Sequence, residues 1–137
     1  MTTLPIRLTP GQDLRHALES AVRAHGGKAA FVLSGIGSLT RTRLRFAGHD
    51  APWACDGPTE IVSLAGTVAP DGSHLHACIA QADGTVRGGH VAQGCVVRTT
   101  AEVLLVMLPG WQFTRTLDAA TGFAELRVGP SGDDRPT

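Results

Sequence analysis

"TEIVSLAGTVAPDGSHLHACIAQADGTVRGGHV", residues 59–91, predicts three consecutive β-strands joined by two tight turns. The turns fall at Asp71–Gly72 and Ala82–Gly84, because aspartate and glycine adopt the backbone conformations that tight turns need. Connections this short leave no room for a crossover helix, so each strand is expected to pair antiparallel with the next. The stretch therefore predicts an antiparallel sheet.

A helix is predicted on the N-terminal side of this region. The segment GQDLRHALESAVRAHGG, residues 11–27, carries apolar side chains at helical spacing, namely Leu14, Ala17, Leu18, Ala21 and Val22. The Asp13 carboxylate suits the start of the helix, and the Gly26-Gly27 pair suits its end because glycine accepts a positive φ. His16 and His25 lie on opposite sides of the helix, and we expect both to face solvent.

Strand patterns occupy most of the remaining chain. They are IRLTP (6–10), KAAFVLSGIGSL (28–39), TRTRLRFAG (40–48), CVVRTTAEVLLVMLPG (95–110), FTRTL (113–117) and FAELRV (123–128), the last two completing the sheet. HDAPWACDGP (49–58) is interpreted as a loop, with a second short helix either there or at 91–94. The prediction is an α+β fold with a central, mainly antiparallel sheet of about eight strands and one main N-terminal helix. We expect a single domain over residues 1–130 and a disordered tail at 131–137.

The charge balance argues against nucleic acid or a membrane as a partner. The 12 lysine and arginine residues match 12 aspartate and glutamate residues, so no long-range positive field is expected. No run of about 18 apolar residues is present, and the first residues lack the pattern of a secretion signal. We therefore expect a cytoplasmic protein with no membrane partner.

Two other groups of side chains receive a structural interpretation. Apolar or small side chains alternate with arginines over residues 41–46, which predicts one buried strand face and one face of solvated arginines. An anion or nucleic-acid contact is the alternative for these arginines, Arg41, Arg43 and Arg45. The three cysteines, Cys55, Cys78 and Cys95, contain no CxxC pair and are interpreted as small buried hydrophobes.

Three histidines fall close together in the second strand pair. His74 and His76 are two residues apart on one strand, so both imidazoles point to the same face. If the turn occupies residues 82–84, Gln81 faces Thr85 and His90 lies opposite His76. A two-residue turn would shift the register by one and move His90 to the other face. The Gly88-Gly89 pair removes side chains that would crowd an ion.

Three neutral imidazoles on one face suit a divalent transition metal, with zinc as the first choice. Three protein ligands are usual where the fourth position holds water or substrate, whereas a structural site needs a fourth ligand. Cys78, on the same strand face as His76, is the candidate for that fourth ligand, and a neighbouring subunit is the other. The alternative is that the HxH pattern is only the polar face of a half-exposed strand.

Two long segments resemble one known family. GPTEIVSLAGTVAPDGSHLHACIAQADGTVRGGHV (57–91) and LTPGQDLRHALESAVRAHGGKAAFVLSGIGSLTRTRLRF (8–46) resemble the plants-and-prokaryotes-conserved (PPC) domain, and the likeness covers residues 5–128. Residues 57–62 match the plant family's Gly-Arg-Phe-Glu-Ile-Leu core, with Pro58 and Thr59 as departures. The resemblance implies an α+β homotrimer and, as in prokaryotic members, a metal held by His74, His76 and His90. The fold is also similar to that of acetolactate decarboxylase, a zinc enzyme with an HxH pair and a later histidine.

The resemblance leaves two functions open. One is a zinc-binding homotrimer whose site binds or processes a small molecule, with Glu60 as a candidate acid–base group and Arg87 as a candidate contact for an anionic substrate. Glu60 could equally be a structural hydrogen-bond acceptor. The other is a non-enzymatic regulatory, DNA-binding or oligomerisation domain. Plant relatives bind DNA through an AT-hook with an Arg-Gly-Arg-Pro core, which this sequence lacks, so nucleic acid is the less favoured partner.

Overall fold

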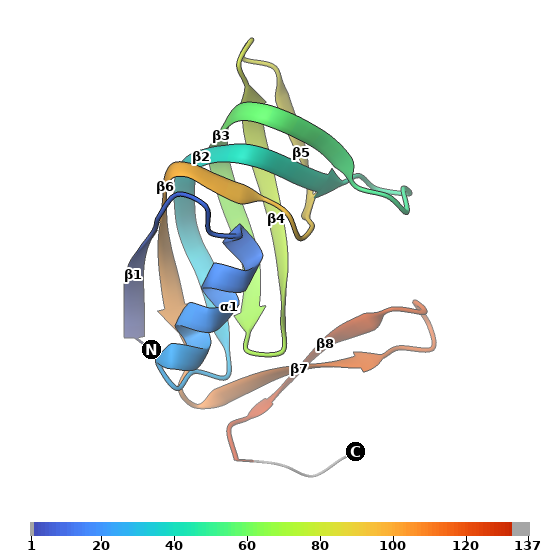
Figure 1. Cartoon of the computed structure of the whole chain (residues 1–137). Coiled ribbons are helices and arrows are strands. Elements are labelled where there is room, and N and C mark those ends of the chain that lie inside the picture. Colours follow the sequence, from blue (N-terminus) through green and yellow to red (C-terminus); the bar gives the residue numbers. More distant parts are fainter. Residues whose placement is uncertain (1, 133–137) are drawn as a thin grey trace.

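One helix and eight strands make up the protein, whose computed structural model describes residues 2–132. The elements are β1 (Thr2–Leu8), α1 (Leu14–Ala24), β2 (Ala30–Arg45), β3 (Trp53–Ala69), β4 (Gly72–Gln81), β5 (Val86–Val91), β6 (Val96–Met107), β7 (Trp111–Leu117) and β8 (Ala124–Pro130). Six strands form one sheet in the order β1-β6-β2-β3-β4-β5, and every neighbouring pair is antiparallel (Figure 1). The predicted α+β fold with an antiparallel sheet and one N-terminal helix is confirmed.

The helix α1 begins and ends close to the predicted residues. One oxygen of the Asp13 carboxylate accepts a hydrogen bond from the backbone N–H of His16 at 3.0 Å, and the other accepts from that of Gly94 at 2.7 Å. The cap therefore also ties the start of the helix to the turn before β6. The side chains of α1 that are buried are Leu14, Ala17, Leu18 and Val22. His16 and His25 are exposed, as predicted.

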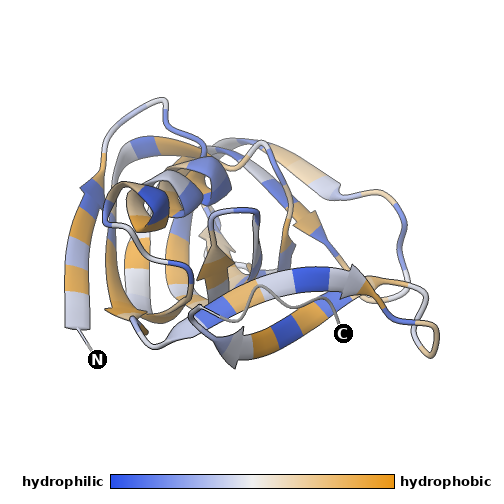
Figure 2. Ribbon diagram, turned by 90° about the horizontal axis from the view of Figure 1, so that it is seen from below, coloured by the Kyte–Doolittle hydropathy of each residue, from blue (hydrophilic) through white to orange (hydrophobic). Residues whose placement is uncertain are grey.

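The main apolar core lies between α1 and the sheet. It joins the buried helix residues to side chains from the central strands, among them Leu44, Leu75 and Ile79, none of which is measurably exposed. Figure 2 shows the alternation of hydrophobic and hydrophilic residues along the strands that produces this one-sided burial. Within the described residues, no helix is long and apolar enough to cross a membrane. The cytoplasmic location stays a prediction.

One end of the sheet closes into a ring of strands. β2 and β3 are 16 and 17 residues long, and both carry register irregularities, at Leu39/Arg41 in β2 and Ile61/Ser63 in β3. Such irregularities let a strand bend. The last residues of β2 therefore reach β5, where Leu44 pairs with Val91 and Arg45 with His90. Since β5 also pairs with β4, the strands β2, β3, β4 and β5 close on themselves.

The predicted loop over residues 49–58 is shorter than expected. Residues 53–58 already belong to β3, because Ala54, Cys55 and Asp56 pair with the end of β2. An ion pair of 2.8 Å between Arg43 and Asp56 joins the two strands at this point. A stretch rich in Pro, Gly and Asp thus forms a strand because its partner strand supplies the hydrogen bonds.

Two other expectations about the fold are wrong. The second short helix is absent from residues 2–132, where the segment at 91–94 ends β5 and then turns. β7 and β8 do not complete the central sheet but form a separate hairpin. Phe113 of β7 packs with Ala29 and Ala69 in a second apolar cluster, which joins the hairpin to the rest of the molecule. Alternation predicts a strand but does not say which sheet it joins.

The cysteines and the C-terminal segment differ in part from expectation. Cys95 is buried, as predicted, whereas Cys55 is half-buried and Cys78 is exposed, because Cys78 lies on the same outward face of β4 as the two histidines. At the start of the predicted disordered tail, the N–H of Ser131 donates to the carbonyl of Gly110 at 3.0 Å. Residues 133–137 of that tail lie outside the described residues, and the domain limit at residue 130 stays a prediction.

Candidate metal centre

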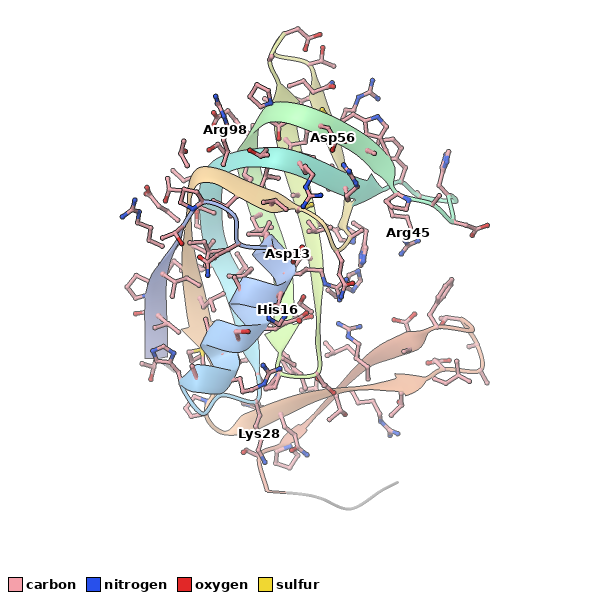
Figure 3. The ribbon with its side chains drawn as sticks, viewed as in Figure 1. Asp13, His16, Lys28, Arg45, Asp56 and Arg98 are labelled. Carbon is pink, nitrogen blue, oxygen red and sulfur yellow. The ribbon has the colours of Figure 1, made fainter. Side chains whose placement is uncertain are left out.

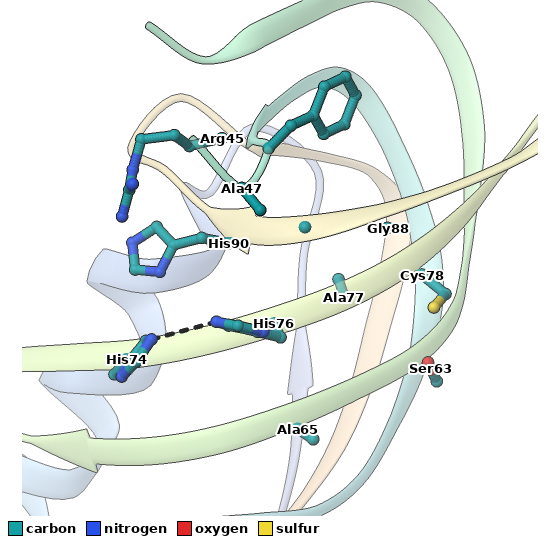
Figure 4. Close-up of a pocket in the computed structure, with 12 residues that line it drawn as sticks. Arg45, Ala47, Ser63, Ala65, His74, His76, Ala77, Cys78, Gly88 and His90 are labelled. Atoms are coloured by element: carbon teal, nitrogen blue, oxygen red, sulfur yellow. Dashed lines mark hydrogen bonds between the residues drawn. The ribbon is translucent and has the colours of Figure 1, made fainter. Parts of the chain in front are cut away.

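The predicted turn and register of the β4–β5 hairpin are confirmed. The N–H of Gln81 donates to the carbonyl of Thr85 at 2.9 Å, and the N–H of Gly84 donates to the carbonyl of Gln81 at 2.8 Å. His76 therefore pairs with His90, with no register shift between the two strands. This brings the three imidazoles to one face of the sheet, where their ring centres lie 5.0, 5.1 and 5.8 Å apart (Figure 4).

The spacing of the imidazole nitrogens fits a small metal ion. One nitrogen from each of His74, His76 and His90 can be chosen so that all three lie within 4.8 Å of one another. The Nε2 atoms of His74 and His76 are 3.1 Å apart. Zinc–nitrogen bonds of about 2.0–2.1 Å in a tetrahedral arrangement place ligand nitrogens roughly 3.3 Å apart. The His74–His76 pair is already close to that spacing, and the whole group lies within 4.8 Å.

His90 supplies a second observation in favour of a metal. Its Nδ1 atom is buried and has no hydrogen-bond partner among the described residues. A buried polar nitrogen without a partner is costly in a folded protein, and a metal bond or a protein donor normally removes that cost. The three-histidine group therefore has both the spacing and an unpartnered nitrogen that suit a metal ion.

The surroundings of the histidines favour their neutral, metal-binding form. Burial, together with the positive charges of His74 and Arg45, lowers the pKa of His90 to about 4. Burial, followed by the charges of His76 and Arg115, also lowers the pKa of His74. A proton and a metal ion compete for the same lone pair, so both shifts keep the ligand nitrogens available at neutral pH.

Acid should destabilise the metal-free protein through His90. The folded pKa of about 4 lies below the ordinary value of 6.5, so the stabilisation is complete above pH 6.5 and is lost as the pH falls toward 4. We expect this loss to be on the order of 1–2 kcal/mol, because partial exposure screens the charges. Urea denaturation of chelator-treated wild type and His90→Gln at pH 7 and pH 4.5 measures it. Equal losses in both proteins would contradict the assignment to His90.

The two glycines before His90 both line the hollow beside the histidines, and they leave room for different neighbours. A Cβ atom on Gly89 would lie 2.9 Å from the backbone oxygen of Arg45, so glycine there allows β5 and β2 to approach closely. A Cβ atom on Gly88 would lie 3.3 Å from the Cys78 sulfur. Gly89 thus permits the strand closure that places His90, and Gly88 leaves space beside Cys78 on the face that carries the histidines.

A hollow opens beside the three histidines. It has a volume of about 520 Å³, and its walls include Cys78, Ser63 and Arg45 as well as the imidazoles (Figure 4). A second hollow of about 320 Å³ shares Arg45, His74 and His90 with the first. The Cys78 sulfur lines the larger hollow but does not belong to the group of closely spaced ligand atoms. Within the described part of the chain, the ligand group thus consists of the three histidines.

The other predicted site residues lie away from the histidines. Glu60 is exposed and pairs with Ala80, four residues along β4 from His76 and so about 13 Å away at the usual strand rise. Arg87 pairs with Ile79, and its guanidinium carbon lies 5.2 Å from the centre of the Trp53 ring. Neither residue lines the hollows beside the metal centre.

Three arginines at the site were not predicted to belong to it. Arg45, interpreted from the sequence as solvated, is half-buried and lines both hollows; Arg41 is exposed, as expected, and Arg43 pairs with Asp56. Arg15 of α1 and Arg115 of β7 line the second hollow. The alternation of arginines with apolar or small residues over 41–46 could have pointed to Arg45, but to neither of the other two arginines. Nothing in the local sequence relates Arg15 or Arg115 to the histidines.

Comparison with known proteins identifies relatives of this fold. The model of the Plants and Prokaryotes Conserved (PCC) domain matches residues 1–109. A hypothetical protein from Salmonella has a solved structure with a TM-score of 0.89 and 36% sequence identity, covering 95% of this chain and 94% of its own. A metal-containing protein from Archaeoglobus fulgidus has a TM-score of 0.79 and 26% identity, covering 91% and 92%.

A curated relative is a much longer protein. The Bifunctional protein GlmU of Synechococcus sp. is 43% identical to this chain over 130 residues, which cover 95% of the chain. The match takes up 21% of that relative, so the chain spans about a fifth of its length. The same kind of domain therefore occurs as part of a larger polypeptide.

Proposed function

The chain belongs to the Plants and Prokaryotes Conserved (PCC) domain family, and we propose that it is a metal-binding member that holds zinc, or another divalent transition metal, through His74, His76 and His90. The observation that carries the proposal is the convergence of three imidazole nitrogens within 4.8 Å. The unpartnered Nδ1 atom of His90 supports it, and so does the likeness to a metal-containing protein at 26% identity.

The chemistry follows from three neutral protein ligands. A zinc ion held by His74, His76 and His90 would supply Lewis-acid chemistry, which polarises an oxygen atom of a bound molecule. The chain's own contribution is to favour the neutral form of His74 and His90, to fix the spacing of the imidazoles through the β4–β5 register, and to present them at a hollow of about 520 Å³. We therefore propose that the site binds or processes a small molecule.

We further propose that the protein assembles as a homotrimer, as the family resemblance implies. Large apolar side chains are exposed on one strand, β2, where Phe31, Leu33 and Ile36 are 44%, 62% and 55% exposed. Several large apolar side chains exposed on one strand favour association with another protein chain. Light scattering over a range of concentrations measures the assembly, and we expect three times the chain mass of 14.3 kDa. A monomer at all concentrations would contradict the trimer.

Elemental analysis tests the metal proposal directly. Protein expressed without a histidine tag, in medium containing trace zinc, is expected to carry about one equivalent of a divalent metal per chain. Dialysis against a chelator should remove it, and one equivalent of zinc should restore it. Protein that neither carries nor takes up a metal would refute the proposal.

A further inference from the structure

Three arginines surround the second hollow, on the side of the histidines away from Cys78. Arg15 comes from α1, Arg45 from the end of β2 and Arg115 from β7, so three separate elements each contribute one guanidinium. Figure 4 shows the Arg45 side chain alongside His90. The hollow also touches His74 and His90 themselves. Positive charge is thus concentrated directly beside the proposed metal, in a chain whose formal net charge is zero.

The protein neutralises these charges only in part. Glu125 is the one carboxylate that lines the hollow, against three guanidinium groups. Within the described residues, neither Arg45 nor Arg115 forms an ion pair with a carboxylate. Arg115 donates instead to the Thr67 hydroxyl at 3.2 Å and to the carbonyl of Ala124 at 3.5 Å. These neutral contacts orient the guanidinium without cancelling its charge.

Arg15 is also incompletely satisfied. Its Nε atom is buried and lacks a hydrogen-bond partner among the described residues, and its ion pair with Glu19 is long, at 3.6 Å. That oxygen already accepts hydrogen bonds from the N–H of Ser73 at 3.0 Å and the Ser73 hydroxyl at 2.7 Å. Grouped cations that lack anionic partners repel one another and are stabilised by a bound anion.

We propose that Arg15, Arg45 and Arg115 bind the anionic group of a small ligand, a carboxylate or a phosphate. A second oxygen atom of the same ligand then binds the metal held by the histidines. This inference rests on the proposed function and gives the ligand class of the same site. Guanidinium groups match carboxylate and phosphate oxygens in pairs of hydrogen bonds. The hollow volume of about 320 Å³ accommodates such a group, and the shared residues Arg45, His74 and His90 place it next to the metal.

The geometry favours a small anion over a nucleic acid. The arginines line a concave hollow rather than a raised strip along the surface, and the chain as a whole carries no net charge. A duplex needs contacts to several phosphates spread along its backbone. Three arginines that line one hollow suit a single anionic group.

The test uses zinc-loaded full-length protein and two probes, inorganic phosphate and lactate, in calorimetric titrations at fixed ionic strength. Wild type should bind at least one probe. Arg15→Gln and Arg45→Gln should each weaken that binding about tenfold or more, as expected for the loss of a charge-assisted hydrogen bond. Arg98→Gln is the matched control, because Arg98 is exposed and lies away from Arg45 (Figure 3). Its affinity should equal that of wild type.

Zinc content and circular dichroism are measured on each variant, so that loss of the fold or of the metal is recognised. Arg45→Lys serves as a second variant that keeps the charge and should lose less affinity than Arg45→Gln. Binding of phosphate alone identifies a phosphate ester as the ligand class, and binding of lactate alone identifies a hydroxycarboxylate. Both results support the proposal.

The failures of the two proposals can be told apart. A protein that binds no zinc refutes the metal site, whereas a zinc-loaded protein that binds neither probe refutes only the anion site. Equal affinities in wild type, Arg15→Gln and Arg45→Gln would also overturn the assignment. Tight binding of a DNA duplex that depends on Arg15 and Arg45, without binding of either small anion, would overturn the proposal. It would show that the arginines bind nucleic acid and not a small anionic ligand.

Discussion

Replacing Gly66 by alanine is expected to lower the free energy of unfolding by at least about 3 kcal/mol. Gly66 lies in β3 with a φ of 140°, a conformation that residues with a side chain rarely adopt. A Cβ atom at this position would lie 2.0 Å from the backbone oxygen of His74. Neither backbone can yield cheaply, because Gly66 pairs with Leu75, which is fully buried.

The same substitution should also disturb the geometry of the candidate metal centre. The atom it displaces is the carbonyl oxygen of His74, so β4 must move away from β3 at the first of the three proposed ligands. The register with β5 fixes His76 opposite His90, and a shift of β4 changes the spacing of the imidazoles. We therefore expect Gly66→Ala to weaken zinc binding as well as the fold.

Gly110→Ala is the control for this prediction. A Cβ atom on Gly110 would meet no atom within 4 Å, and its φ is not positive, so the change should stay within about 0.5 kcal/mol. Urea denaturation of the chelator-treated proteins gives both free energies, and zinc titration of the refolded samples gives the affinities. Equal stability of the two variants would show that β3 and β4 tolerate a side chain at their closest approach.

Removing His74 and His76 together should abolish the stabilisation of the protein by zinc. A ligand that binds only the folded state adds RT ln(1 + [L]/Kd), which is about 4 kcal/mol when free zinc exceeds its dissociation constant 1,000-fold. In His74→Ala/His76→Ala only one of the three proposed ligands remains, so zinc should leave the unfolding transition unchanged. Thermal unfolding with and without added zinc measures the difference.

The metal-free forms provide the internal control. Both histidine side chains are exposed, so the double variant without metal should match metal-free wild type within about 1 kcal/mol. His16→Ala removes an exposed histidine of α1 and should keep the full zinc effect. Stabilisation by zinc that persists in the double variant would place the metal elsewhere in the chain.

The three-histidine cluster was largely predictable because its geometry depends on local rules. Side chains two apart on a strand share a face, which placed His74 with His76, and a three-residue turn at 82–84 set His90 opposite His76. Helix α1 was predictable from equally local signals, namely an aspartate cap at its start and glycines after its end. The family resemblance independently pointed to the same three histidines.

Two of the errors concern contacts between different elements of the fold. The segment after His49 has the composition of a loop, yet residues 53–58 pair with β2 and become strand. β7 and β8 alternate like the other strands but pack as a separate hairpin through Phe113. Cys78 was expected to be buried, although its parity with His76 places it on the exposed face.

The sequence by itself determined the fold class, the helix and the three histidines, because each depends on spacing within one element or one tight turn. Only the tertiary structure decided what surrounds them. The bend of β2 and its closure onto β5 bring Arg45 to His90, and the packing of α1 and β7 adds Arg15 and Arg115 to the same hollow. Those three arginines lie 30 and 70 residues apart in the chain, so their meeting follows from the closure of the sheet and from no local pattern.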